Sequence, residues 1–162
     1  MNASYVEDGL QPPGRGAREV QGGTSVSSAS RVHPDREGMI GVMVVDDQAC
    51  FRMAARALID ATAGFEAIGE AEGGAEALRR ADQLRPDLVL MDVRMPGMDG
   101  FEAARRLTEA HPECVVVLVS VDQAEGAHAA AASAGAAAVM RKQDLRRSTL
   151  GELWTIHGSP RR

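Results

Sequence analysis

Five side chains could do chemistry together: three carboxylates, one hydroxyl and one ammonium. Asp46 and Asp47 follow the apolar run MIGVMVV, Asp92 follows DLVLM, and Ser120 closes CVVVLVS. Lys142, the single lysine beside seventeen arginines, comes just after AAVM. Two carboxylates about 4 Å apart repel by roughly 4 kcal/mol at an effective dielectric of 20, so three need a cation or protons. Oxygen ligands with an open face suit Mg²⁺, which completes its shell with water or phosphate.

Taken singly, each acidic residue has a simpler structural explanation. Asp46 or Asp47 could cap a helix that begins at QACFRMAARAL, and Asp92 could begin a turn. The lone lysine argues for a site, because an ammonium is a compact charge on a flexible stem whereas a guanidinium is a planar fork. A small site that already holds carboxylates and a cation has more room for Lys142 than for an arginine.

The elements that must position these groups alternate between apolar runs and amphipathic stretches. Strands are predicted at 39–45, 65–71, 87–91, 114–120 and 137–140. Helices are predicted over about 48–62, 73–85, 101–110, 122–134 and 144–156. This alternation predicts a doubly wound α/β fold with a five-stranded parallel sheet. Ligands of such folds bind at the carboxyl ends of the strands, where all five groups fall.

Composition bounds the class of protein. A chain of 162 residues that is 44% hydrophobic can bury one core, and a net charge of −5 with a pI near 5.4 provides no basic face for nucleic acid or anionic lipid. Cys50 and Cys114 lie far apart without metal-ligand spacing, which suits a reducing compartment. No apolar run approaches the roughly 18 residues of a membrane span. We expect a cytoplasmic protein that binds neither DNA nor membrane directly.

Domain organisation changes near residue 39. Residues 1–38 are rich in Gly, Ser and Pro and show no period, so they are predicted to form a disordered N-terminal extension. The alternative is that translation begins at Met39, which stands immediately before the first predicted strand, and that residues 1–38 are not part of the protein. The folded domain is expected over 39–156, followed by a short tail at 157–162.

The strings VMVVDDQ, PDLVLMDVRMPGMDG, VLVS and AGAAAVMRK occur in this order and resemble the receiver domain of two-component response regulators. The resemblance covers about residues 39–156, and DLVLMDVRMPGMDG is its most specific part. The stretch SVDQAE and the lack of proline after the lysine resemble the NarL/FixJ-like subgroup. The resemblance implies a flavodoxin-like (βα)5 fold with strand order 2-1-3-4-5, which periodicity alone does not determine.

The resemblance also implies a metal site and a phosphoacceptor. Asp92 matches the residue whose carboxylate attacks a phosphoryl group and forms an acyl phosphate. Asp47, Asp92 and the main-chain carbonyl of Arg94 match the Mg²⁺ ligands, and Asp46 would act directly or through a coordinated water. The implied phosphoryl donor is a sensor histidine kinase.

Two further residues match the family's phosphoryl contacts. Ser120 matches the hydroxyl that hydrogen-bonds a phosphoryl oxygen, and Lys142 matches the lysine that pairs with that group or, before transfer, with Asp92. The chain departs from the family at Val139, where many receivers have an aromatic residue, and at Val121, where a small residue is common. These departures leave the acidic residues, the hydroxyl and the lysine unchanged.

The protein is expected to pass on its signal by binding other proteins. The sequence stops at TIHGSPRR, shortly after the last predicted helix, so we expect a stand-alone receiver without a DNA-binding domain. It would catalyse its own phosphorylation and dephosphorylation, and would contact a downstream target or a second copy through the fourth helix, fifth strand and fifth helix. A phosphorylation-independent interaction domain and a truncated transcriptional regulator are the alternatives.

Overall fold

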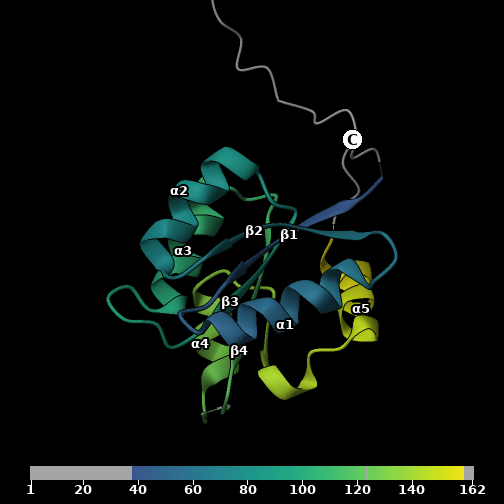
Figure 1. Cartoon of the computed structure of the whole chain (residues 1–162). Coiled ribbons are helices and arrows are strands. Elements are labelled where there is room, and N and C mark those ends of the chain that lie inside the picture. Colours follow the sequence, from purple (N-terminus) through teal and green to yellow (C-terminus); the bar gives the residue numbers. More distant parts are fainter. Residues whose placement is uncertain (1–37, 123, 159–162) are drawn as a thin grey trace, which may run out of the picture. The chain divides into compact units, whose positions relative to one another are not determined.

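The computed structural model describes residues 38–122 and 124–158. Five parallel strands form one sheet in the order β2-β1-β3-β4-β5, which confirms the expected flavodoxin-like architecture and strand order (Figure 1). The elements are β1 (Ile40–Val45), α1 (Ala49–Asp60), β2 (Phe65–Ala71), α2 (Gly74–Leu84), β3 (Leu88–Asp92), α3 (Gly100–Ala110), β4 (Val115–Ser120), α4 (Ala127–Ser133), β5 (Ala138–Arg141), the 3-10 turn η1 (Lys142–Asp144) and α5 (Arg147–His157).

The three central strands are buried on both faces, because helices cover each side of the sheet. Alternate residues therefore enter two separate cores. One core lies against α2, α3 and α4 and contains Met43, Val45, Val89, Met91, Val116 and Leu118. The other lies against α1 and α5 and contains Val42, Val44, Leu88, Leu90, Val115 and Val117.

Two helices begin several residues later than predicted. The helix predicted from 122 begins only at Ala127, because Gly126 immediately before it has a left-handed φ of 83°. The helix predicted from 144 begins at Arg147, after the turn η1. Lys142 is the first residue of that turn, so it stands at the point where strand β5 ends and the 3-10 turn begins.

Most of the two chain termini lie outside the described residues. Apart from Gly38, the predicted disordered extension lies outside the described residues, as do residues 159–162 of the predicted tail. Helix α5 continues to His157, one residue beyond the predicted boundary. Within the described ranges, none of the helices combines the length and apolar character that a membrane crossing requires.

The two cysteines should differ sharply in reactivity, since a thiol reacts as its thiolate. Cys114 is buried, and burial, aided by the charges of Asp87 and Glu113, raises the pKa of its thiol to about 12. Cys50 is exposed on α1. We expect a disulfide reagent at about pH 8 to modify one thiol in the folded protein and both in denaturant. Cys50→Ser should remove the native-state reaction, and equal reaction rates at the two thiols would contradict this assignment.

Candidate functional site

The sheet order brings the predicted residues to one edge. Asp92 and Ser120 are the last residues of the neighbouring strands β3 and β4, and Asp46 and Asp47 directly follow β1. Carboxylate oxygens of Asp46, Asp47 and Asp92 all lie within 4.8 Å of one another. Lys142 reaches the same place from the end of β5. The structure therefore assembles the three carboxylates and the ammonium as one cluster.

Asp46 is fully buried, and its backbone N–H and one carboxylate oxygen are hydrogen-bonded. Its N–H donates to the Ala71 carbonyl at 3.0 Å, and its Oδ1 accepts a hydrogen bond from the Gln48 N–H at 2.8 Å. Gln48 is the N-cap residue of α1 and makes no side-chain cap bond. Neither aspartate of the pair is therefore the N-cap residue of α1, although Asp46 Oδ1 accepts a hydrogen bond just before the helix begins.

Lys142 lies closer to Asp46 than to its expected partner. Its Nζ is 2.6 Å from Asp46 Oδ2 and 3.5 Å from Asp92 Oδ1. The ammonium also lies 4.5 Å from the centroid of the Phe51 ring, a cation–π distance. The sequence does not predict this contact, since helical spacing does not show what lies opposite the Phe51 ring.

Asp92 is buried at the end of β3. Burial and then the neighbouring Asp46 charge raise the pKa of its carboxyl, although Lys142 and a backbone hydrogen bond from Arg94 act against them. Ser120 is also buried, and its hydroxyl donates to the Asp122 carbonyl at 2.8 Å. The hydroxyl is thus engaged with its own loop.

Arg94 lies in the loop after β3 and is exposed. It lines the same cavity of about 520 Å³ as Asp47, and Pro96 and Asp99 complete much of that cavity's wall. A ligand bound at the carboxylates would therefore have open space between the β1 and β3 loops.

The donor set fits Mg²⁺. Three carboxylates meet one ammonium, so the cluster keeps excess negative charge. Asp46 Oδ2 is buried and accepts no directed hydrogen bond from the described residues, although the ammonium is in ion-pair contact with it. Hard oxygen ligands beside an open cavity are what Mg²⁺ requires, because it retains several waters. Asp46, Asp47 and Asp92 are the side chains that could hold the ion.

The loop between β3 and α3 leads directly into the helix. Asp99 is the N-cap of α3, and its Oδ1 accepts a hydrogen bond from the Glu102 N–H at 2.9 Å. Gly100 is buried against the β3 end, where an added Cβ would clash with the Asp92 carbonyl oxygen. The helix entry and the Asp92 backbone therefore pack directly on one another.

Comparison with known proteins decides the family. The family model for the response regulator receiver domain matches residues 42–150 of this chain. The chain belongs to the response regulator receiver family. This receiver is 41% identical over 104 residues to the response regulator GacA of Pseudomonas viridiflava, covering 64% of this chain and 49% of GacA. It is 36% identical over 106 residues to protein-glutamate methylesterase/protein-glutamine glutaminase 2 of Methanospirillum hungatei, covering 64% of this chain and 30% of that enzyme.

Solved structures agree with this assignment. The signal receiver domain of the NarL regulator of Mycobacterium tuberculosis matches with a TM-score of 0.66 and 30% identity over 73% of this chain and 94% of that one. The response regulator domain of Thermotoga maritima CheB matches with a TM-score of 0.66 and 28% identity over 75% and 99% of the two chains. The receiver spans about half the length of GacA, so the output of that longer protein does not transfer with the match.

Proposed function

We propose that this receiver accepts a phosphoryl group on Asp92 from a sensor histidine kinase, in a Mg²⁺-dependent reaction in the cytoplasm. The observation that carries the proposal is the cluster itself: three carboxylates within 4.8 Å of one another, with the ammonium of Lys142 2.6 Å from one and 3.5 Å from another. A structural role alone does not account for this arrangement, because two of the three carboxylates are buried, and buried like charges are costly.

The reaction follows from what each side chain can do. A carboxylate oxygen of Asp92 attacks the phosphorus, the bond from phosphorus to the donor breaks, and the donor's leaving group keeps the electron pair. When bound by Asp46, Asp47, Asp92 and the Arg94 carbonyl, Mg²⁺ would neutralise charge on the transferring oxygens. Lys142 is within reach of Asp92 and would pair with the phosphoryl group after transfer.

Signal output is proposed to begin at Ser120. Its hydroxyl donates to the Asp122 carbonyl, and it would have to exchange that acceptor for a phosphoryl oxygen. The exchange would release Asp122 in the loop before α4. A cavity of about 180 Å³ adjoins this loop and is lined by Ser120, Val139 and Ala127, so side chains there have room to move. We propose that a downstream protein or a second copy reads the change on the face of α4, β5 and α5.

Mass spectrometry after incubation with Mg²⁺ and a small acyl phosphate tests the phosphoryl transfer. We expect an adduct of about 80 Da, the mass of one added phosphoryl group, on the wild-type protein. Asp92→Asn and chelation of Mg²⁺ should each abolish the adduct. Absence of the adduct from the wild-type protein would refute the proposal.

A phosphorylation-independent interaction domain is the second candidate. Val139 favours it, since this residue stands in place of the usual aromatic and lines the cavity beside Ser120. Binding of a partner protein with equal affinity before and after phosphorylation would support this candidate. A receiver from a NarL/FixJ-like transcriptional regulator is compatible with the similarity to GacA and shares the proposed phosphoryl chemistry.

A further inference from the structure

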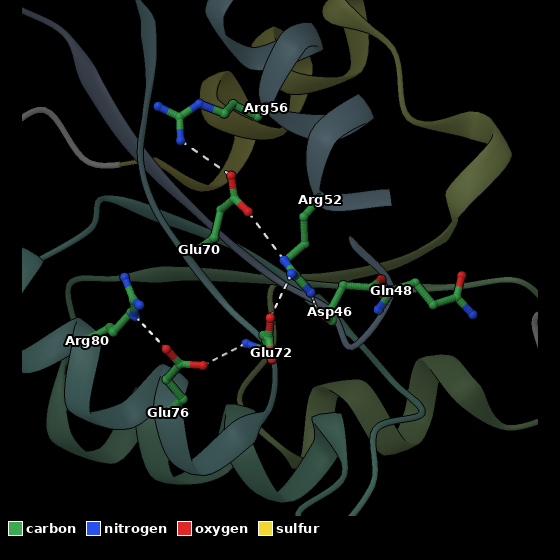
Figure 2. A network of polar contacts seen from close by, with 8 residues as sticks. All are labelled: Asp46, Gln48, Arg52, Arg56, Glu70, Glu72, Glu76 and Arg80. Atoms are coloured by element: carbon green, nitrogen blue, oxygen red, sulfur yellow. Dashed lines mark hydrogen bonds and ion pairs between the residues drawn. The ribbon is translucent and has the colours of Figure 1, made fainter. Parts of the chain in front are cut away.

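Arg52 of α1 is a buried charge that the phosphoryl chemistry does not use directly. Only 8% of the residue is exposed, although α1 otherwise buries small or apolar side chains. Figure 2 shows its guanidinium between the end of β1 and two carboxylates from the end of β2. A charge buried at this depth needs a structural or functional reason, because its desolvation is costly.

Each nitrogen of the guanidinium has its own acceptor. Nη1 donates to the Asp46 carbonyl oxygen at 2.7 Å, Nε to Glu70 Oε2 at 3.2 Å, and Nη2 to Glu72 Oε1 at 2.9 Å. Three acceptors in three directions match the planar fork of arginine, whereas an ammonium on a lysine stem has no such fixed directions. The sequence therefore carries arginine here for its geometry.

Arg52 contacts the backbone of the loop after β1, which carries the proposed metal ligands Asp46 and Asp47. The Asp46 carbonyl belongs to the peptide unit that joins Asp46 to Asp47. Asp47 is exposed and makes no hydrogen bond or ion pair with the other residues that the structure describes. The placement of the Asp47 side chain consequently depends on the path of its backbone, and Arg52 holds the carbonyl that precedes Asp47.

The two glutamates fix the guanidinium in turn. Glu70 also accepts from Arg56 Nη1 at 3.3 Å, and the Glu72 N–H donates to Glu76 Oε2 at 2.9 Å (Figure 2). These bonds tie α1, β2 and α2 around Arg52. Arg52 is itself paired with these two carboxylates, so little of its charge is left to neutralise the acidic cluster, and its contribution is orientation.

We propose that Arg52 is a positioning residue, which holds the Asp46–Asp47 peptide in the orientation that lets Asp47 bind Mg²⁺. The inference rests on the proposed function, since it assigns the metal to the same carboxylates. Partners of metal ligands commonly contribute 10- to 100-fold in metal affinity, and we expect an effect of about this size.

Mg²⁺ titration of Arg52→Lys, followed by the NMR amide signals of the loop after β1, tests the inference. This variant keeps the charge and loses the fork, and we expect the dissociation constant for Mg²⁺ to rise about tenfold or more. Arg56→Lys is the matched control: Arg56 lies one helical turn further along α1 and also pairs with Glu70, but it makes no contact with Asp46. Its dissociation constant should stay within about twofold of the wild-type value.

Unfolding in urea without Mg²⁺ separates positioning from stability. A purely structural role would lower the stability of Arg52→Lys while the folded fraction bound Mg²⁺ as the wild type does, and that result would overturn the inference. If Arg52→Lys does not fold, Glu72→Ala takes its place, because alanine removes the acceptor of Nη2 whereas glutamine would keep it. Weaker Mg²⁺ binding is then the supporting result and unchanged binding the refuting one. A wild-type protein that binds no Mg²⁺ would instead refute the proposed function.

Discussion

Replacing Lys142 with arginine is expected to slow the phosphorylation of Asp92 by about a hundredfold, although the substitution conserves charge. The lysine stem is nearly buried, with 11% of the side chain exposed. Its ammonium fits among Asp46, Asp92 and the Phe51 ring at 2.6, 3.5 and 4.5 Å. A guanidinium is larger and prefers a bidentate pair with one carboxylate, so it cannot occupy the same position between two acids. The rate of adduct formation at saturating acyl phosphate and Mg²⁺ measures the effect.

Arg141→Lys provides the matched control for this experiment. Arg141 is the preceding residue, and its exposed guanidinium pairs with Asp144 at 2.9 Å, away from the acidic cluster. Exposed ion pairs contribute little, so the control should phosphorylate at the wild-type rate. A wild-type rate together with unchanged partner binding in Lys142→Arg would show that a compact ammonium is not required.

Gly100→Ala is expected to destabilise the receiver by about 2 to 3 kcal/mol and to slow phosphorylation as well. The added Cβ would clash with the Asp92 carbonyl oxygen and would lie 2.8 Å from Val93 Cα and 3.0 Å from the Asp92 carbonyl carbon. All three atoms belong to the backbone, so no side chain can rotate away to relieve the contact. The chain can respond only by moving the Asp92 backbone or the start of α3. Urea unfolding gives the loss of stability.

Gly151→Ala is the control for the loss of stability in Gly100→Ala. It tests whether that loss comes from the contact with the Asp92 backbone or from replacing any glycine in a helix. Gly151 lies in α5, and a Cβ there would meet nothing within 4 Å. Alanine should therefore raise the free energy of unfolding by about 0.5 to 1 kcal/mol, the usual difference between these residues in a helix. If Gly100→Ala were as stable as Gly151→Ala, the close packing of α3 on β3 would be wrong.

The local pattern of the sequence predicted the elements well because strands and helices differ in period. Continuous apolar runs identified the buried strands, and amphipathic stretches identified the helices between them. The same pattern failed at α4, where the left-handed Gly126 delays the start of the helix. A single backbone angle of this kind leaves no periodic signal.

The acidic cluster was also predictable, since its members follow apolar strands whose carboxyl ends must share one edge of a parallel sheet. The strand order came only from the resemblance to receivers, because periodicity does not say which strands are neighbours. The preference of Lys142 for Asp46 over Asp92 was not predicted, as it depends on sub-ångström differences between side chains from β1, β3 and the turn after β5.

By itself, then, the sequence determined the alternation of strands and helices and the chemistry available at their ends. Tertiary structure decided what surrounds that chemistry. Arg52 shows the difference most clearly: its position in the chain suggests an ordinary helix arginine, yet it is buried and pairs with Glu70 of β2 and with Glu72 just after that strand. Phe51 likewise comes to lie beneath Lys142 through contacts far apart in sequence. Such partners come together only when the strands and helices pack on one another. The local periodicity of the sequence therefore cannot predict them.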